Sequence, residues 1–237
     1  MAELLRDAAK AKRAPVILAR LAEAYPDARI ALHFSDPWQL LVATVLSAQC
    51  TDKKVNEVTA EFFPRYPGPQ AVAEAPLNEL EDILRPTGFF RQKARNLSAT
   101  ARSLLESHDG KVPDTMNELL ELPGVARKTA NVVLSNAFEV HVGIVVDTHV
   151  RRISRRLGLT RHEDPVKIEL DLMKLFPHGR WLEVSDLFIA HGRRTCLAQR
   201  PRCHDCAVEH LCPSSQVAGR RDRYRQRAEG DTKRRSR

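Results

Sequence analysis

Apolar residues recur along the chain at the spacing of amphipathic helices, and short stretches with Pro or Gly separate the apolar segments. Ile17, Leu18, Leu21 and Tyr25 share one helix face in a segment that Pro15 opens and Pro26 ends. The same spacing predicts further helices over residues 38–48, 52–62, 77–84, 90–106, 115–122, 127–137, 148–157, 166–176 and 181–190.

Polar residues and prolines indicate where several of these helices begin. Asp36 and Pro37 form an N-cap and first-turn pair, Asp52 is a candidate cap for the next helix, and a turn is expected over Pro64–Pro69. Only residues 140–146 resemble a strand, and a lone strand has no partner, so we expect an extended connector there. The pattern predicts an all-α fold, and no fixed-period repeat indicates a solenoid.

Composition and charge add a candidate partner. The chain has 237 residues, of which 43% are hydrophobic, enough for one large core or two small ones, and a formal net charge of +8 favours a polyanion as ligand. Nine Arg and Lys against three Asp and Glu follow Cys212, so this end carries most of the excess. We expect residues 215–237 to be a disordered basic tail that strengthens nucleic-acid binding without reading sequence.

No segment has the roughly 20 apolar residues of a spanning helix, and the first residues lack an apolar signal core. We therefore expect a soluble protein of the cytoplasm, associated with the nucleoid. Four of the five cysteines follow the spacing Cys196-x6-Cys203-x2-Cys206-x5-Cys212. Without a secretion signal this density indicates a metal site, and four thiolates suit zinc or a [4Fe–4S] cluster about equally.

The most informative local segment is Leu122–Ala130, LPGVARKTA, between two predicted helices. A Pro-Gly turn that runs into a helix start presents backbone N–H groups and the positive end of the helix dipole, an arrangement that suits a phosphate. Gly124 removes the side chain where a ligand would approach. As a bare pattern, such a turn is also an ordinary helix cap.

In context, this segment resembles the helix-hairpin-helix motif of the endonuclease III family. The members of that family are base-excision DNA glycosylases with AP lyase activity. Other segments resemble the same family in the same order, from about Lys12 to Cys212: residues 46–52 (LSAQCTD), residues 87–89 (TGF) with Lys93 and Ala94, residues 146–149 (VDTH), and the cysteine loop, residues 193–212. The resemblance implies a two-lobed helix-hairpin-helix glycosylase fold with an iron–sulfur cluster loop, so that the four cysteines would hold a [4Fe–4S] cluster, with zinc as the alternative.

The resemblance assigns the chemistry to Lys128 and Asp147. A neutral amine at Lys128 would attack the sugar C1′ and form a Schiff base, and the strand would then be cleaved by β-elimination. The helix N-terminus and Arg127 both disfavour a further positive charge at Lys128. Asp147 would assist departure of the base and stabilise the cationic transition state, although capping of the following helix is an alternative role.

The resemblance also assigns residues that contact DNA. Gln49 and Phe89 would enter the duplex while the target base is extrahelical, His149 would lie near the pocket, and the hairpin Gly124, Val125, Ala126 and Arg127 would bind phosphate. From sequence alone, Gln49 could be a helix C-terminus, Phe89 a core residue and His149 a surface residue. The family often has Gly at Ala126 and an aliphatic residue at Phe89; we expect a negative φ at Ala126 because the helix begins there.

Four segments are expected: residues 1–29, a helix of the cluster domain; 30–140, a helical domain with the hairpin; 141–214, the cluster domain; and 215–237, the tail. The predicted protein is a monomer that removes oxidised pyrimidines from double-stranded DNA and cleaves abasic sites. The alternatives are an adenine-mismatch glycosylase of the same fold, which typically lacks the lysine, and a non-catalytic DNA-binding module, which would not require Lys128 and Asp147 together.

Overall fold

The computed structural model describes residues 2–217, with side chains from residue 9 onward. Within these residues the chain forms helices and no strand, which confirms the all-α class. Residues 140–146 form an irregular connector, as expected. Most of the predicted basic tail, from residue 218 onward, lies outside the described residues. No helix in the described part is long and apolar enough to cross a membrane.

The chain folds into two compact units. We call Ile30–Val142 the contiguous unit, because it is a single stretch of chain. The discontinuous unit combines the described residues up to Arg29 with the described residues from Gly143 onward. The first helix of the protein therefore shares a unit with its cysteine loop.

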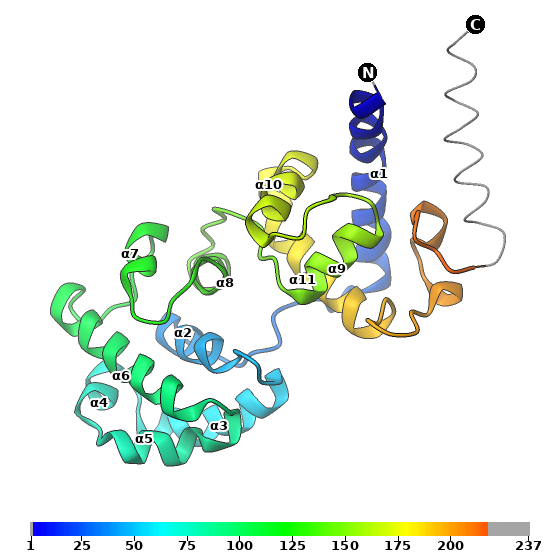
Figure 1. Cartoon of the computed structure of the whole chain (residues 1–237). Helices are drawn as coiled ribbons and strands as arrows, with labels where there is room; N and C mark the ends of the chain where they lie inside the picture. Colours follow the sequence, from blue (N-terminus) through cyan, green and yellow to red (C-terminus); the bar gives the residue numbers. More distant parts are fainter. Residues whose placement is uncertain (1, 218–237) are drawn as a thin grey trace, which may run out of the picture. The chain divides into compact units, whose positions relative to one another are not determined.

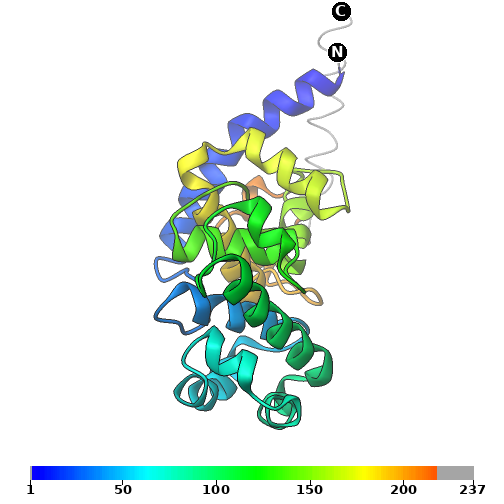
Figure 2. The same cartoon turned by 90° about the vertical axis from the view of Figure 1, so that its left-hand side faces the viewer.

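The contiguous unit consists of seven α-helices and a short 3-10 helix in the described residues (Figures 1 and 2). Helix α6 packs on α4 and α5, and α8 packs on α2 and α7. The elements are α2 (Pro37–Leu46), α3 (Asp52–Arg65), α4 (Pro69–Glu74), α5 (Leu77–Leu84), η1 (Arg85–Thr87), α6 (Phe90–Ser107), α7 (Met116–Glu121) and α8 (Arg127–Ala137).

Helix α2 is the central element of this unit and is apolar on all sides, so it is buried against α3, α6 and α8. Leu40, Leu41 and Leu46 have no exposed surface, and each such side chain contributes about 1.5–3 kcal/mol by burial. The side chain of Asp36 accepts a hydrogen bond from the Gln39 N–H at 2.8 Å. The predicted N-cap is confirmed.

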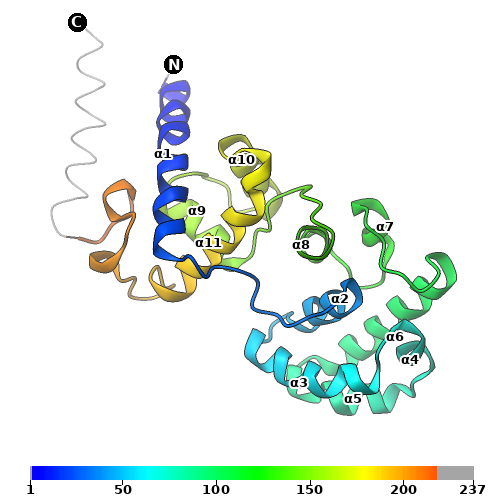
Figure 3. The same cartoon turned by 180° about the vertical axis from the view of Figure 1, so that it is seen from behind.

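In its described residues, the discontinuous unit packs four helices around its own core (Figures 1 and 3). Helix α11 contacts both α1 and α9, and the Phe176 and Phe188 rings meet edge to face at 6.1 Å. The elements are α1 (Ala2–Ala24), α9 (Thr148–Arg156), α10 (Pro165–Leu175), α11 (Trp181–Arg194) and three 3-10 turns, η2 (His178–Arg180), η3 (Cys203–Asp205) and η4 (Glu209–Leu211).

Three local predictions were wrong. Pro15 lies inside α1 rather than at its start, because the residues before it are rich in Ala, Leu, Lys and Arg, which are strong helix formers. Thr51, not Asp52, is the N-cap of α3, and its hydroxyl accepts from the Lys54 N–H. The turn predicted over Pro64–Pro69 is shorter, because Pro64 lies inside α3 and Pro69 begins α4, a helix of six residues that is too short to show a periodic pattern.

Candidate functional site

The hairpin of the contiguous unit is the turn between α7 and α8, residues 122–126. Gly124 has a φ of +78°, a left-handed conformation that favours glycine. A Cβ on Gly124 would lie 2.5 Å from Nδ2 of Asn96 on α6, and the Thr100 hydroxyl donates to the Pro123 carbonyl at 2.8 Å. Helix α6 thus fixes the turn through two residues that the sequence did not indicate, since both contacts are long-range.

Ala126 is the N-cap of α8 and has a φ of −96° and a ψ of 166°. The expected negative φ is confirmed, so alanine causes no backbone strain here. No side chain of the described residues caps this helix, and its first intrahelical bond runs from the Ala130 N–H to the Ala126 carbonyl. Helix geometry therefore leaves the N–H groups of the first turn, residues 127–129, directed out of the helix end.

Lys128 lies in the first turn of α8 and its side chain is exposed, whereas Arg127 beside it is half-buried. Val125 is buried under the turn, and its N–H bonds the Leu122 carbonyl at 3.1 Å. The hairpin thus presents an amine next to a helix N-terminus.

Asp147 is in the discontinuous unit and is the N-cap of α9. Its Oδ1 accepts from the Val150 N–H at 2.8 Å, which confirms that it caps the helix, and the carboxylate is half-buried. Two residues earlier, the Val145 N–H donates to the Ser185 hydroxyl on α11 at 3.0 Å. Ser185 therefore fixes the extended segment that leads into Asp147, a role invisible in the sequence pattern.

His149, on the first turn of α9, is half-buried against α11. A Cβ on Gly192 would come within 2.8 Å of its Nδ1, so the glycine makes room for the ring. Arg152 Nη2 lies 3.1 Å from the same nitrogen. Burial lowers the pKa of His149 and the nearby Asp147 carboxylate opposes this, so the imidazole is neutral at neutral pH.

Gln49 and Phe89 share an unusual backbone conformation in the contiguous unit. Their φ angles are +53° and +48°, in the left-handed region that is uncommon for residues other than glycine. Gln49 lies three residues past the end of α2, and Phe89 immediately precedes α6 with 66% of its surface exposed. Phe89 is therefore not a core residue, and Gln49 does not end a helix.

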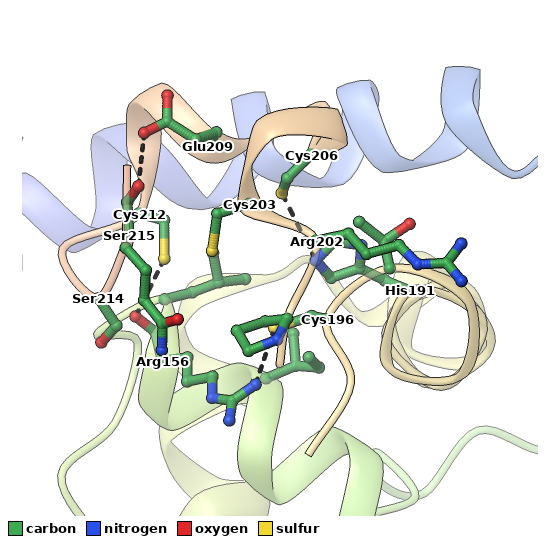
Figure 4. A pocket seen from close by; sticks show the side chains of 15 residues that line it. Arg156, His191, Cys196, Arg202, Cys203, Cys206, Glu209, Cys212, Ser214 and Ser215 are labelled. Atoms are coloured by element: carbon green, nitrogen blue, oxygen red, sulfur yellow. Dashed lines mark hydrogen bonds between the residues drawn. The ribbon is translucent and has the colours of Figure 1, made fainter. Parts of the chain in front are cut away.

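The four loop cysteines line one cavity of the discontinuous unit (Figure 4). All are free thiols, and burial raises the pKa of Cys206 to about 11 and that of Cys212 to about 12. Metal loading would therefore have to displace protons. Among the described residues, no three His, Cys, Asp or Glu side chains are already arranged as metal ligands. The donor set of four thiols in one loop and one cavity nevertheless fits a four-thiolate group.

An arginine of α9 holds the cysteine loop (Figure 4). Arg156 Nη1 lies 3.3 Å from the Cys196 sulfur and donates to the Leu197 carbonyl at 2.6 Å, and its Nη2 donates to the Ala198 carbonyl at 2.8 Å. Arg13 of α1 bonds the Leu157 and Leu211 carbonyls. Two arginines from distant segments of the chain thus bind residues in or next to the loop. Cys50, outside the loop, is half-buried.

Comparison with known proteins identifies the class. Residues 42–178 match the HhH-GPD superfamily of base excision DNA repair proteins. Endonuclease III of Synechocystis sp. is 52% identical over 219 residues, which are 92% of this chain and 100% of the relative. Endonuclease III of Escherichia coli (strain K12) is 41% identical over 203 residues, which are 86% of this chain and 95% of the relative.

Similar solved structures indicate the same class of protein. A trapped endonuclease III–DNA covalent intermediate has a TM-score of 0.84 and 43% identity, with coverage of 87% of this chain and 97% of that chain. A thermostable thymine-DNA glycosylase, at 23% identity and a TM-score of 0.77, shares the fold. The fold and the hairpin therefore define a helix-hairpin-helix base excision repair protein. Within that class the chain belongs to the endonuclease III family. It is a bifunctional DNA glycosylase and AP lyase, as the sequence resemblance predicted.

Proposed function

We propose that Lys128 is the nucleophile of this enzyme and that its substrates are oxidised pyrimidines and abasic sites in double-stranded DNA. The observation that carries the proposal is the exposed amine on the first turn of α8, directly after the glycine turn. The N–H groups of that turn suit a phosphate of the DNA backbone, and the amine lies beside them. Gly124, Ala126 and Arg127 supply the phosphate contacts, and Val125, whose N–H bonds the Leu122 carbonyl, supports the turn from below.

The reaction begins when the amine of Lys128 attacks the sugar C1′. A new C–N bond forms, the glycosidic bond breaks, its electron pair leaves with the base, and the lysine proton is transferred away. Ring opening gives a Schiff base, which makes the C2′ proton acidic. Loss of that proton then expels the 3′ phosphate by β-elimination, and water releases the product from the lysine.

Asp147 stabilises the positive charge that develops on the sugar as the base departs. Capping of α9 uses only Oδ1 of the carboxylate, so the second oxygen is available for this electrostatic role. The carboxylate is half-buried, which strengthens its effect on a nearby charge relative to a fully solvated group. His149 is neutral and contributes a polar contact to the lesion pocket.

Cys196, Cys203, Cys206 and Cys212 hold a [4Fe–4S] cluster in this proposal, because their spacing follows that of the family and their thiols line one cavity. A cluster with four thiolate ligands would tie the loop together and could exchange one electron. Iron and sulfide analysis of purified protein separates this assignment from zinc. The protein acts as a monomer, a prediction that sedimentation would test.

Borohydride trapping on duplex DNA with an abasic site tests the assignment of Lys128. The wild-type protein should form a covalent adduct and Lys128→Ala should form none. Lys167→Ala is a matched control, because Lys167 is also an exposed lysine in the first turn of a helix, α10. If Lys128→Ala still forms the adduct, another amine is the nucleophile. An enzyme that releases mispaired adenine but leaves oxidised pyrimidines would instead be the adenine-specific alternative.

A further inference from the structure

Lys93 on α6 is a buried lysine, with 4% of its surface exposed. Its Nζ donates two hydrogen bonds of 2.8 Å, one to the Leu46 carbonyl and one to the Thr87 carbonyl. All three residues belong to the contiguous unit. One ammonium group thus joins two segments of chain about 40 residues apart in sequence.

Each of the two carbonyls belongs to the last residue of a helical element. Leu46 is the last residue of α2, where the helix has no N–H group left to pair with its carbonyl, and Thr87 is the last residue of η1. Gln49 follows Leu46 by three residues, and Phe89 follows Thr87 by two. We call the segments that follow α2 and η1 the Gln49 loop and the Phe89 loop. Lys93 therefore binds the residue from which each of these loops begins.

The loops need such a restraint because their backbones are strained. Gln49 and Phe89 both have positive φ, and such conformations persist only where the surrounding structure holds them. The Lys93 ammonium is desolvated because only 4% of the residue is exposed, and this burial lowers its pKa, while the nearby Cys50 opposes the shift. A merely space-filling role would be better served by an apolar side chain, since burial of a charge is costly unless it is hydrogen-bonded.

We propose that Lys93 is a positioning residue that couples the Gln49 and Phe89 loops, so that both side chains enter the duplex as one unit when the target base leaves the stack. This rests on the proposed function and on the family resemblance, which assigns Gln49 and Phe89 to the interrupted duplex. Unstacking a base costs free energy, and two side chains already held in place offset it better than two mobile loops. Lys93 itself is no candidate nucleophile, because its amine is buried and engaged.

Lys93→Met tests the proposal, since it keeps an unbranched side chain but removes both donors. We expect single-turnover release of an oxidised pyrimidine from duplex DNA to slow at least tenfold. The fluorescence increase of a 2-aminopurine beside the lesion, which reports unstacking, should be lost. Borohydride trapping on a preformed abasic site should change less than threefold, because no damaged base must be extruded there.

Val72→Ala is the control for loss of stability, because Val72 is fully buried on α4, which packs on α6 away from both loops. In the Val72→Ala variant, the ratio of the base-release rate to the yield of borohydride trapping should equal that of the wild type. If Lys93→Met fails to fold, Lys93→Gln, with a neutral donor one bond shorter, should show the same selective loss to a smaller extent. Equal losses of base release and trapping, or no loss of either, would overturn the proposal. An adduct formed by Lys128→Ala would instead refute the proposed function.

Discussion

The Val145 N–H donates to the hydroxyl of Ser185 at 3.0 Å, and both groups are buried. Ser185 lies on α11, so this bond ties the chain just before Asp147 to a rigid helix. The same hydroxyl donates to the Trp181 carbonyl one turn earlier. A serine that no motif indicates therefore helps to fix the direction from which the chain enters α9.

Ser185→Ala should leave the Val145 N–H buried without a partner and lower the free energy of unfolding by about 1–3 kcal/mol. Base release should slow further than the loss of stability accounts for, because Asp147 would be held less firmly. Ser154→Ala is the matched control: the Ser154 hydroxyl is buried without a partner in the described part of the chain, so its removal should be nearly neutral. Urea unfolding and single-turnover assays of both variants check this; equal effects would contradict it.

Gly124→Ala should disturb the hairpin. The added Cβ would meet Asn96 and would occupy a left-handed conformation, which together should cost about 1–2 kcal/mol or more. The dissociation constant for abasic DNA should rise at low salt. Gly68→Ala in the same unit is the control, because a Cβ there meets no atom within 4 Å and φ is not positive. Unchanged DNA binding by Gly124→Ala would show that the turn does not need its glycine.

Asp147→Asn separates the two roles of this residue. Asn is as good an N-cap as Asp, so the free energy of unfolding should change by less than about 0.5 kcal/mol. Loss of the negative charge should slow base release by about 100-fold or more, while a Schiff base with a preformed abasic site should still be trapped. A variant with normal base release but reduced stability would show that Asp147 only caps α9.

Asp186 on α11 should make stability depend on pH. Burial raises its pKa to about 7 from an ordinary 3.8, so between pH 4 and pH 7 the folded protein holds a proton that the unfolded chain has released. Its contribution to stability is thus present at pH 4 and is lost as the pH rises to 7, at no more than about 1.4 kcal/mol per pH unit.

The Asp186→Asn variant should therefore gain stability relative to the wild type between pH 5 and pH 8. Urea unfolding of both proteins at pH 5 and at pH 8 measures this difference in the free energy of unfolding. Asp114→Asn, at an exposed aspartate, is the control for the loss of one carboxylate. If the wild type instead became more stable relative to Asp186→Asn as the pH rose, the raised pKa of Asp186 would be contradicted.

Arg156→Met should detach the cysteine loop from α9, because it removes three hydrogen bonds to residues 196–198. We expect less iron per protein and faster loss of iron to a chelator. Arg155→Met is the matched control, since its neighbour Arg155 is exposed and pairs only with exposed Glu163 at 2.9 Å in the described structure. If both variants retain iron equally, Arg156 does not support the loop.

The sequence predicted those features that depend on neighbouring residues. Apolar spacing indicated most helices, Asp36 and Asp147 were recognisable as caps, and the turn at Gly124 was visible as Pro-Gly. Helix α4 escaped because it is short. The assignments of Lys128 and Asp147 came from family resemblance, since an exposed lysine and a capping aspartate are common in any helical protein.

Contacts between distant segments could not be predicted. Asn96 under the hairpin, Ser185 behind Asp147 and Lys93 between two loops each depend on how helices pack. Buried polar side chains of this kind are placed by the tertiary fold, and their local sequence shows only a polar residue on a helix.

The ion pair between Asp27 and Arg194 joins the end of α1 to the end of α11, and Tyr25 hydrogen-bonds His191 and Thr195 at the same place. During synthesis, α1 leaves the ribosome well before these partners exist. Residues 30–142 can complete their core while α1 still lacks its own. We therefore expect assembly of the cysteine cavity to be a late event, so that the proposed cluster would bind stably only after the first and last described segments of the chain have met.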